Sequence, residues 1–236
     1  MSCQKFNTGL ILLFLLTVIS YSVNLDDAFA LDSIDEIDSG LHEPLFIDLV
    51  RPIDSKKGQL EVNSLCYGKS KIAYSPEIEY VVEDGLGFEL ELPINYNGQL
   101  ESIKTAVQKR LNSDYISKRY DHGFQVIGEK NLNGNGSSLT LFYISGYNKR
   151  DISLVMLSGF KKSSDKYSLL LNSTLYKNYN QNFAYGIEVN YDKKGDVRYR
   201  ILPQIKIHFS EKYEIQGGIG IDDQSMISAL RMIMVF

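Results

Sequence analysis

A period-two alternation of apolar and polar residues, which recurs from about residue 57 onward, constrains the fold most strongly. The clearest run extends from Val197 to Phe209, where every odd position is apolar and nearly every even position is polar. Successive side chains of a β-strand point to opposite faces, so this run predicts a strand with one apolar and one polar face. At ~3.3 Å per residue the strand would reach ~40 Å, which exceeds most strands of soluble proteins.

Turn-forming residues such as Asp84-Gly85 and Asn97-Gly98 separate the alternating runs. Counting the runs predicts twelve strands, and an even number returns both chain ends to one side, as in single-chain bacterial barrels. The segment from Gln99 to Leu111 also fits a short amphipathic helix, so ten strands plus a helix is the alternative. The twelve predicted strands cover residues 58–69, 73–83, 86–95, 100–111, 121–130, 137–147, 151–161, 166–177, 181–191, 196–209, 212–222 and 226–236.

Alternation alone also fits a soluble β-sandwich or closed barrel, in which the apolar face turns inward. Two observations favour a membrane barrel. The polar faces carry glycines such as Gly146 and Gly186, which suit a crowded lumen better than a solvated exterior. Tyrosines also crowd the predicted strand ends, as an interfacial girdle would; they are Tyr67, Tyr74, Tyr80, Tyr143, Tyr147, Tyr167, Tyr176, Tyr185, Tyr191, Tyr199 and Tyr213. We therefore predict an all-β, antiparallel, up-and-down transmembrane β-barrel over residues 57–236.

The N-terminal residues 1–30 have the pattern of an export signal. Lys5 precedes an apolar run from Gly9 to Ser20, and Ala28-Phe29-Ala30 offers the small-x-small pattern that a signal peptidase cleaves. The alternatives are earlier cleavage, near Ser20 or Ser22, and an uncleaved anchor, although a spanning helix needs ~20 apolar residues. Residues 31–56 are first acidic and then apolar, which predicts a periplasmic N-terminal segment or a partial plug of the barrel.

Composition excludes several classes of function. The net charge of −4 shows no basic excess, so we expect no nucleic-acid partner. Cleavage of the signal removes Cys3 and leaves Cys66 alone, so no intramolecular disulfide is expected. No Cys or His residues stand at metal-ligand spacing, and we predict neither a metal nor a cofactor.

The last predicted strand carries an alternating apolar set, Leu230, Met232, Met234 and Phe236. With the signal segment, the alternating strands and the tyrosines, this set resembles Gram-negative outer-membrane β-barrel proteins of the small porin or transporter class. The resemblance implies location in the bacterial outer membrane, contact with its lipids, and recognition of the terminal strand by the barrel-insertion machinery. Met234 stands where that class prefers an aromatic residue. The segment from His42-Glu43-Pro44-Leu45 to Leu92-Pro93 also resembles transporter-like barrels found near degradative pathways.

If apolar faces meet lipid, the polar faces line the lumen, because charged side chains facing lipid would cost several kcal/mol. Opposed charge clusters in a small aqueous passage would orient polar or ionic solutes, which predicts a channel or transporter. The alternative is a structural or adhesion barrel whose narrow bore is filled by its own side chains. The predicted lumen residues are Glu61, Glu79, Glu83, Glu89, Glu91, Lys104, Arg110, Glu188, Arg198, Arg200, Gln204, Lys206 and His208.

His208-Phe209-Ser210 is the best candidate for catalysis, because His and Ser two positions apart share a strand face. The pair resembles the His-x-Ser of lipid A deacylase-like barrels, with Glu214 or Asp222 as an orienting acid. That chemistry needs the pair to face lipid, whereas the alternation places His208 inward. We therefore expect no enzyme, with a lipid hydrolase as the least favoured alternative.

Overall fold

The computed structural model describes residues 41–46, 56–111, 120–134, 136–149, 151–164, 166–194, 196–210, 212–223 and 225–236. The predicted export signal at 1–30 and most of the predicted segment 31–56 lie outside these residues. The barrel and the six residues 41–46 belong to one compact unit that spans Ile37–Phe236.

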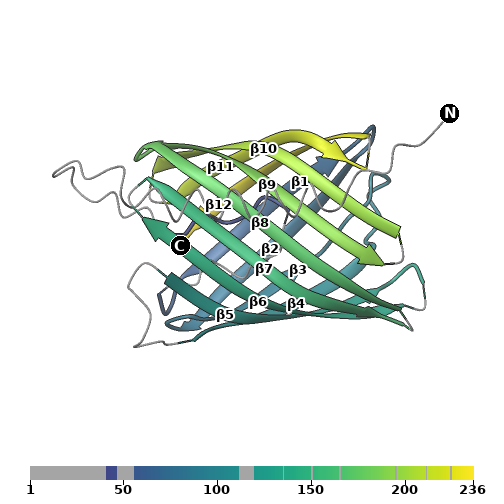
Figure 1. Cartoon of the computed structure of the whole chain (residues 1–236). Helices are drawn as coiled ribbons and strands as arrows, with labels where there is room; N and C mark the ends of the chain where they lie inside the picture. The colour runs from purple at the N-terminus through teal and green to yellow at the C-terminus, as the bar shows by residue number, and fades with distance from the viewer. Residues whose placement is uncertain are drawn as a thin grey trace. The chain divides into compact units, whose positions relative to one another are not determined.

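Twelve antiparallel strands form a closed barrel in which each strand pairs with its neighbours in sequence and β12 pairs with β1 (Figure 1). The prediction of an all-β, twelve-stranded barrel is confirmed. The strands are β1 (Leu60–Gly68), β2 (Ile72–Glu83), β3 (Leu86–Glu91), β4 (Ser102–Leu111), β5 (Tyr120–Asn131), β6 (Ser137–Lys149), β7 (Ile152–Ser163), β8 (Lys166–Asn180), β9 (Phe183–Lys194), β10 (Asp196–Ser210), β11 (Tyr213–Asp222) and β12 (Ser225–Val235).

The alternative of ten strands plus a helix is wrong. The ambiguous segment forms β4, whose backbone pairs with β3 on one side and with β5 on the other. Pairing on both edges satisfies the backbone groups of a segment whose local pattern was ambiguous. No helix in the described part of the chain is long and apolar enough to cross a membrane.

Pairing of the first strand with the last closes the barrel. Val62 lies opposite Met234 and Cys66 opposite Leu230, and the Phe236 amide donates a hydrogen bond of 2.8 Å to the Leu60 carbonyl. We call the rim that carries Leu60 and Val235 the proximal rim, and the rim that carries the β1–β2 turn the distal rim.

The third strand is shorter than predicted. It ends at Glu91 rather than near residue 95, because Pro93 lacks the amide hydrogen that a ladder needs. Ile94 still makes isolated bridges to Tyr74 and to Leu100. At the proximal end of the same strand, Gly85 adopts φ = 70° in the β2–β3 turn, a conformation that favours glycine.

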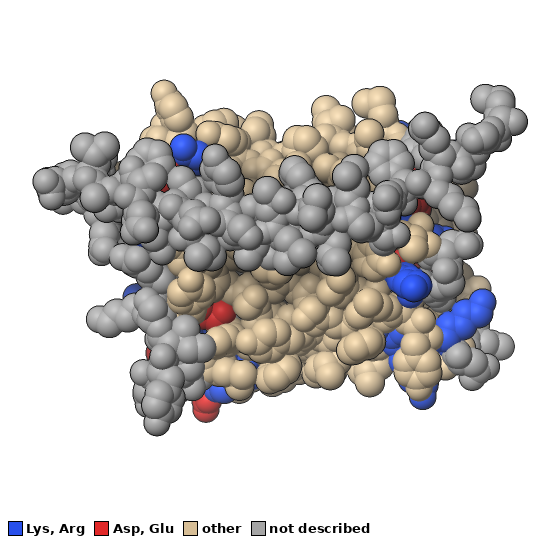
Figure 2. All heavy atoms as spheres, viewed as in Figure 1, with Lys and Arg blue, Asp and Glu red and all other residues tan. Residues whose placement is uncertain are grey.

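The outer wall of the barrel is apolar. Along β12, Leu230 and Met232 are exposed, whereas Ala229 and Arg231, one position away, are buried. Figure 2 shows uncharged residues over the visible wall and charged residues gathered towards the two ends. Exposed tyrosines on this wall include Tyr80, Tyr143 and Tyr185.

Two members of the predicted tyrosine girdle face the interior instead. Tyr67 packs edge-on against the ring of Phe46, with 5.9 Å between centroids. Tyr176 is fully buried beside His42, with 5.0 Å between centroids. Both share the strand face of inward residues, so alternation rather than residue type decides the side on which a tyrosine lies.

Candidate functional site in the barrel lumen

The proximal half of the lumen is occupied by residues 41–46 of the same chain. Leu45 is 0% exposed, and His42 and Glu43 are nearly as buried. Leu41 and His42 contact residues near the proximal rim, Gly146 and Ser153, whereas Phe46 contacts Arg200 near the distal rim. The segment therefore runs along the lumen rather than across its mouth.

Three wall side chains, from β9, β11 and β12, hold residues 43–46 of this segment by their main chain. Glu188 of β9 accepts hydrogen bonds from the amides of Leu45 (2.8 Å) and Phe46 (3.3 Å). Gln216 of β11 donates 2.9 Å to the Glu43 carbonyl, and Arg231 of β12 donates 3.2 Å to the Pro44 carbonyl. We call Glu188, Gln216 and Arg231 the main-chain clamp.

Apolar side chains of the segment fit shaped recesses. Leu41 lies over Gly146 so closely that a Cβ at position 146 would stand 2.3 Å from the leucine Cδ1 atom. Glycine at this point of β6 therefore makes room for Leu41. Leu45 packs into a second cluster, whose other buried members are Leu65, Leu202, Ile227 and Ala229.

His42 is fixed by polar partners at the proximal end. Its backbone amide donates to Ser153 Oγ (3.0 Å), and its Nε2 lies 2.5 Å from Asn178 Oδ1. Burial, with a further contribution from the charge of Lys206, lowers the pKa of His42 to about 3. The imidazole is therefore neutral in the seated segment.

Beside Glu43, strands β1 to β3 present a wall of buried carboxylates. Asn63 donates to both Glu77 and Glu79 at 2.8 Å, and carboxylate oxygens lie within 4.8 Å of one another in two triads, Glu43-Glu61-Glu79 and Glu77-Glu89-Glu91. This is the spacing at which oxygen ligands hold a cation, and it is also the spacing at which carboxyl groups share protons.

Two cations offset this acidic wall. Arg231 Nη1 lies 3.3 Å from Glu43 Oε2, and Lys104 Nζ lies 2.7 Å from Glu91 Oε2. Burial and the neighbouring Glu61 raise the pKa of Glu43 to about 8, although Arg231 opposes the rise. Near neutral pH the Glu43 carboxyl therefore holds a proton for much of the time, and Arg231 balances the acidic wall as a group.

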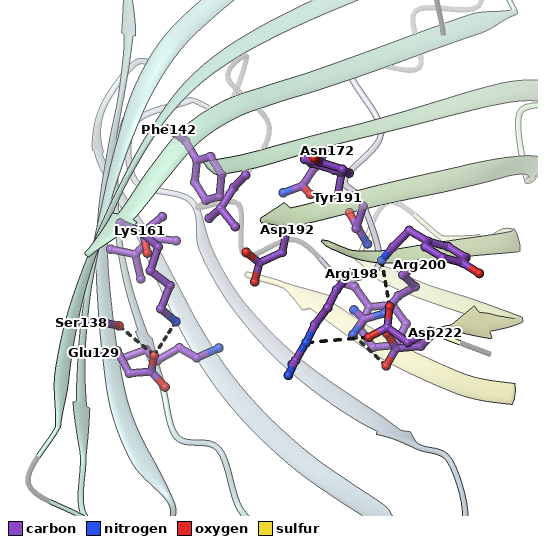
Figure 3. A pocket seen from close by; sticks show the side chains of 18 of the residues that line it. Glu129, Ser138, Phe142, Lys161, Asn172, Tyr191, Asp192, Arg198, Arg200 and Asp222 are labelled. Atoms are coloured by element: carbon purple, nitrogen blue, oxygen red, sulfur yellow. Dashed lines mark hydrogen bonds and ion pairs between the residues drawn. The ribbon is translucent and has the colours of Figure 1, made fainter. Parts of the chain in front are cut away.

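The distal half of the lumen contains a cavity of about 640 Å³, which we call the vestibule (Figure 3). Lys161, Glu129 and Ser138 lie on one side of it, and Arg198, Arg200 and Asp222 on the other. Each of the five cations that line it pairs with a carboxylate. The pairs are Lys69–Asp222 (3.3 Å), Lys104–Glu91 (2.7 Å), Lys161–Glu129 (3.0 Å), Arg198–Asp223 (3.8 Å) and Arg200–Asp222 (3.7 Å).

Phe46 joins the two halves of the lumen. Its ring lines the vestibule, and the Arg200 guanidinium lies over it, 4.2 Å from the ring centroid. The last described residue of the segment thus forms part of the boundary between the filled half and the hollow half.

The predicted lumen residues occupy four kinds of position. Glu79, Glu89, Glu91, Glu188 and Lys206 are buried inside the barrel. Lys104, Arg198 and Arg200 line the vestibule, and the Arg198 side chain is 73% exposed. His208 and the buried Gln204 and Glu61 lie on inward faces in the proximal half.

Two other predicted lumen residues lie at the proximal rim. The Glu83 side chain is 67% exposed and 3.8 Å from Lys109 Nζ, because an irregularity between Val81 and Glu83 shifts the end of β2 out of the simple alternation. Arg110 pairs with Asp121 at 2.5 Å and is 41% exposed.

The hydrolase constellation is only partly assembled. His208 Nδ1 lies 3.1 Å from Glu214 Oε2, the acid named from sequence. Ser210 Oγ instead accepts a hydrogen bond from the Lys212 amide (3.2 Å). Within the described residues no hydrogen bond joins His208 to Ser210, so the nucleophile–base contact of a triad is not formed.

Sequence reasoning did not identify the main-chain clamp. Gln216 and Arg231 lie on the inward faces that alternation predicts, but nothing in their spacing shows that they bind a distant hexapeptide. Glu188 was predicted to line the lumen, without its peptide partner. The useful signal was the change from acidic to apolar residues within 31–56, which marked a segment able to lie inside the barrel.

Comparisons with known proteins agree with this fold. Residues 40–146 match a family model described as HAEPLYID-like, and the match includes residues 41–46. No match was found among the curated proteins. Among solved structures, the chain is similar to the KdgM porin in complex with disordered oligogalacturonate, with a TM-score of 0.63, 11% identity, and coverage of 75% of this chain and 99% of that one. The NanC porin gives a TM-score of 0.56 at 10% identity, covering 75% and 98% of the two chains. The fold is thus that of outer-membrane porins.

Proposed function

We propose that this protein is a channel of the bacterial outer membrane for small polar solutes, which enter through the vestibule. The observation that carries the proposal is a charged cavity of about 640 Å³ inside a closed, outwardly apolar barrel. An even strand number favours placing both chain ends on the periplasmic side. The distal rim and its vestibule would then face the cell exterior.

The charges of the vestibule favour a neutral or zwitterionic solute. Its cations are matched by Glu91, Glu129, Asp222 and Asp223, and Asp192 adds a further acid to the lining. Paired charges produce local dipoles rather than a large field of one sign, and such dipoles orient a solute that carries both donors and acceptors. The volume lies in the range of pockets that hold small organic molecules.

The KdgM porin was solved with oligogalacturonate, which is an acidic sugar chain. We propose a different preference for this chain, because a polyanion would have to compete with the carboxylates that already pair with the vestibule cations. Liposomes containing the refolded protein should swell faster in a neutral disaccharide or a small zwitterion than in oligogalacturonate of equal osmolarity. Faster swelling in oligogalacturonate would contradict this preference.

Single-channel recording in a planar bilayer tests the channel itself. We expect brief, resolved openings of the full chain, and Lys161→Glu should shift their selectivity towards cations by reversing one wall of the vestibule. The matched control is Lys162→Glu, one residue along β7, which alternation places on the outer face and which should leave selectivity unchanged.

The second candidate function is a closed structural barrel, favoured by the segment that fills the proximal half. It predicts silence in the bilayer both from the full chain and from variants with a weakened main-chain clamp. Intact heat-modifiable migration on gels would show that such silent protein is still a folded barrel.

A further inference from the structure

We propose that the proximal lumen is a peptide-binding site whose occupant is the segment Leu41–Phe46, and that departure of this segment opens the channel. The proposal rests on the proposed channel function and adds the means of its regulation. The bound ligand is an extended peptide recognised through its main chain.

The first argument is the form of recognition. Glu188 accepts two consecutive amides, and Gln216 and Arg231 donate to two consecutive carbonyls. These wall groups come from three strands, β9, β11 and β12, and converge on adjacent peptide units. Glu188 and Gln216 also hydrogen-bond to wall neighbours such as Gln204. Side chains that merely filled a narrow bore would make only such wall contacts, whereas these also bind the main chain of a separate segment.

The second argument is shape. Leu41 lies over a point of β6 where only glycine leaves room, because a Cβ at Gly146 would stand 2.3 Å from it. Leu45 enters a recess formed by residues of β1, β10 and β12. Two anchors four residues apart fix the register of the segment, just as pockets for alternate side chains fix bound peptides in other sites.

The third argument concerns reversibility. None of residues 41–46 belongs to a strand of the barrel, so the segment can leave without breaking a ladder. Beside the apolar recesses that hold Leu41 and Leu45, the wall that it covers carries buried polar side chains, including Glu61, Asn178, Glu188, Gln204 and Gln216. A polar wall accepts water when it is vacated, whereas an apolar one would leave a costly void.

A disulfide lock tests the proposal in the full chain. An ideal Cβ at position 146 lies 3.3 Å from Leu41 Cγ, close to where a cysteine sulfur at 41 would stand, and disulfides need Cβ atoms about 3.8 Å apart. The variant Leu41→Cys/Gly146→Cys is made with Cys3→Ser and Cys66→Ser. Each single cysteine in the same background is a control, and mass spectrometry establishes the bond.

In the planar bilayer we expect the oxidised variant to be closed and the reduced variant to open, with open probability differing by at least about tenfold. The single-cysteine controls should not respond to reductant. Equally frequent openings of the oxidised and the reduced protein would overturn the gate while leaving the channel function intact.

Weakening the main-chain clamp distinguishes failure of the gate from failure of the proposed channel function. Glu188→Gln keeps the side-chain size but removes the charge that accepts two amides, so open probability should rise about tenfold. Glu101→Gln, at an exposed position before β4, is the matched control. Silence from the reduced lock and from Glu188→Gln, with folded barrels in both, would overturn the proposed channel and the gate together. If Glu188→Gln conducts while the reduced Leu41→Cys/Gly146→Cys variant stays silent, residues 41–46 close the channel but leave it only when the clamp is weakened, which supports the gate.

Discussion

The two halves of the lumen are built from the same alternating strands but are filled in opposite ways. In the proximal half, residues 41–46 cover the inward faces, with apolar anchors of their own and with the main-chain clamp of the wall holding their backbone. In the distal half, inward side chains form ion pairs around a cavity of about 640 Å³. The strands thus provide a lumen with polar walls, and a six-residue segment decides which part of the lumen is filled and which part is hollow.

The exposure of charged side chains also differs between the two halves of the lumen. Carboxylates of the proximal half, such as Glu61 and Glu79, are almost fully buried. Ion pairs of the vestibule, such as Lys161–Glu129, are about one-third exposed. Removing one partner should therefore be costly where the segment excludes water and mild where solvent reaches the pair.

The largest effect is expected from Arg231→Met. This change removes the donor to the Pro44 carbonyl and the cation that lies 3.3 Å from Glu43, leaving the buried acidic wall with one counter-charge fewer. We expect the free energy of unfolding to fall by about 3 kcal/mol, measured by urea titration in lipid vesicles. Arg198→Met, at the exposed distal rim, is the control. A loss as small as that of the control would contradict the contrast between the two halves.

A smaller effect is expected from Gly146→Val, which places a branched side chain where Leu41 lies. Overpacking of this kind costs about 1–3 kcal/mol, and displacement of the segment is the simplest relief. A cysteine at position 45, in the Cys3→Ser/Cys66→Ser background, should then react with a soluble thiol reagent at least about fivefold faster. Gly128→Val is the matched control, because a Cβ there would meet only Thr105 Oγ1, at 3.6 Å. Unchanged reactivity would argue against displacement.

The open probability of the channel should rise on two sides of a minimum in pH, which we call the acidic limb and the alkaline limb. The pKa of Glu43 is raised from 4.5 to about 8, so seating of the segment is fully favoured below pH 4.5 and weakens as pH rises to 8. The pKa of His42 is lowered from 6.5 to about 3, so seating is fully favoured above pH 6.5 and weakens as pH falls to 3.

Between pH 4.5 and 6.5 the two slopes oppose each other, so open probability should be lowest there and rise on both sides. The neighbouring groups around Glu43 are Glu61, Glu77, Glu79, Arg231 and Lys206, and those around His42 are Lys206 and His208. Glu43→Gln should remove the alkaline limb and His42→Gln the acidic limb. A monotonic profile in the unmodified chain would refute this account.

The smallest effect is expected in the vestibule. Lys161→Met removes an ion pair of 3.0 Å whose members are 37% and 26% exposed. The free energy of unfolding should change by less than about 1 kcal/mol, since solvent screens such pairs. A loss as large as that of Arg231→Met would show that the vestibule is as dry as the filled half.

The sequence by itself determined the barrel. Alternation gave the inward and outward faces of each strand, as at Leu230 and Arg231, because a strand turns successive side chains to opposite sides. Turn residues gave the number of strands. Pro93 ends β3 earlier than predicted, and the irregularity at Glu83 moves that side chain out of the simple alternation. Residue type alone misplaced Tyr67 and Tyr176, which pack inside the barrel.

Only the tertiary structure decided what fills the lumen. Closing the barrel brings Glu188, Gln216 and Arg231 together, and they meet a segment more than 140 positions earlier in the chain. No local pattern encodes such a meeting, because it depends on the register of twelve strands around a closed ring. The sequence thus specified a wall with one polar and one apolar face. Closure of the barrel decided which segment this wall binds and where a cavity is left.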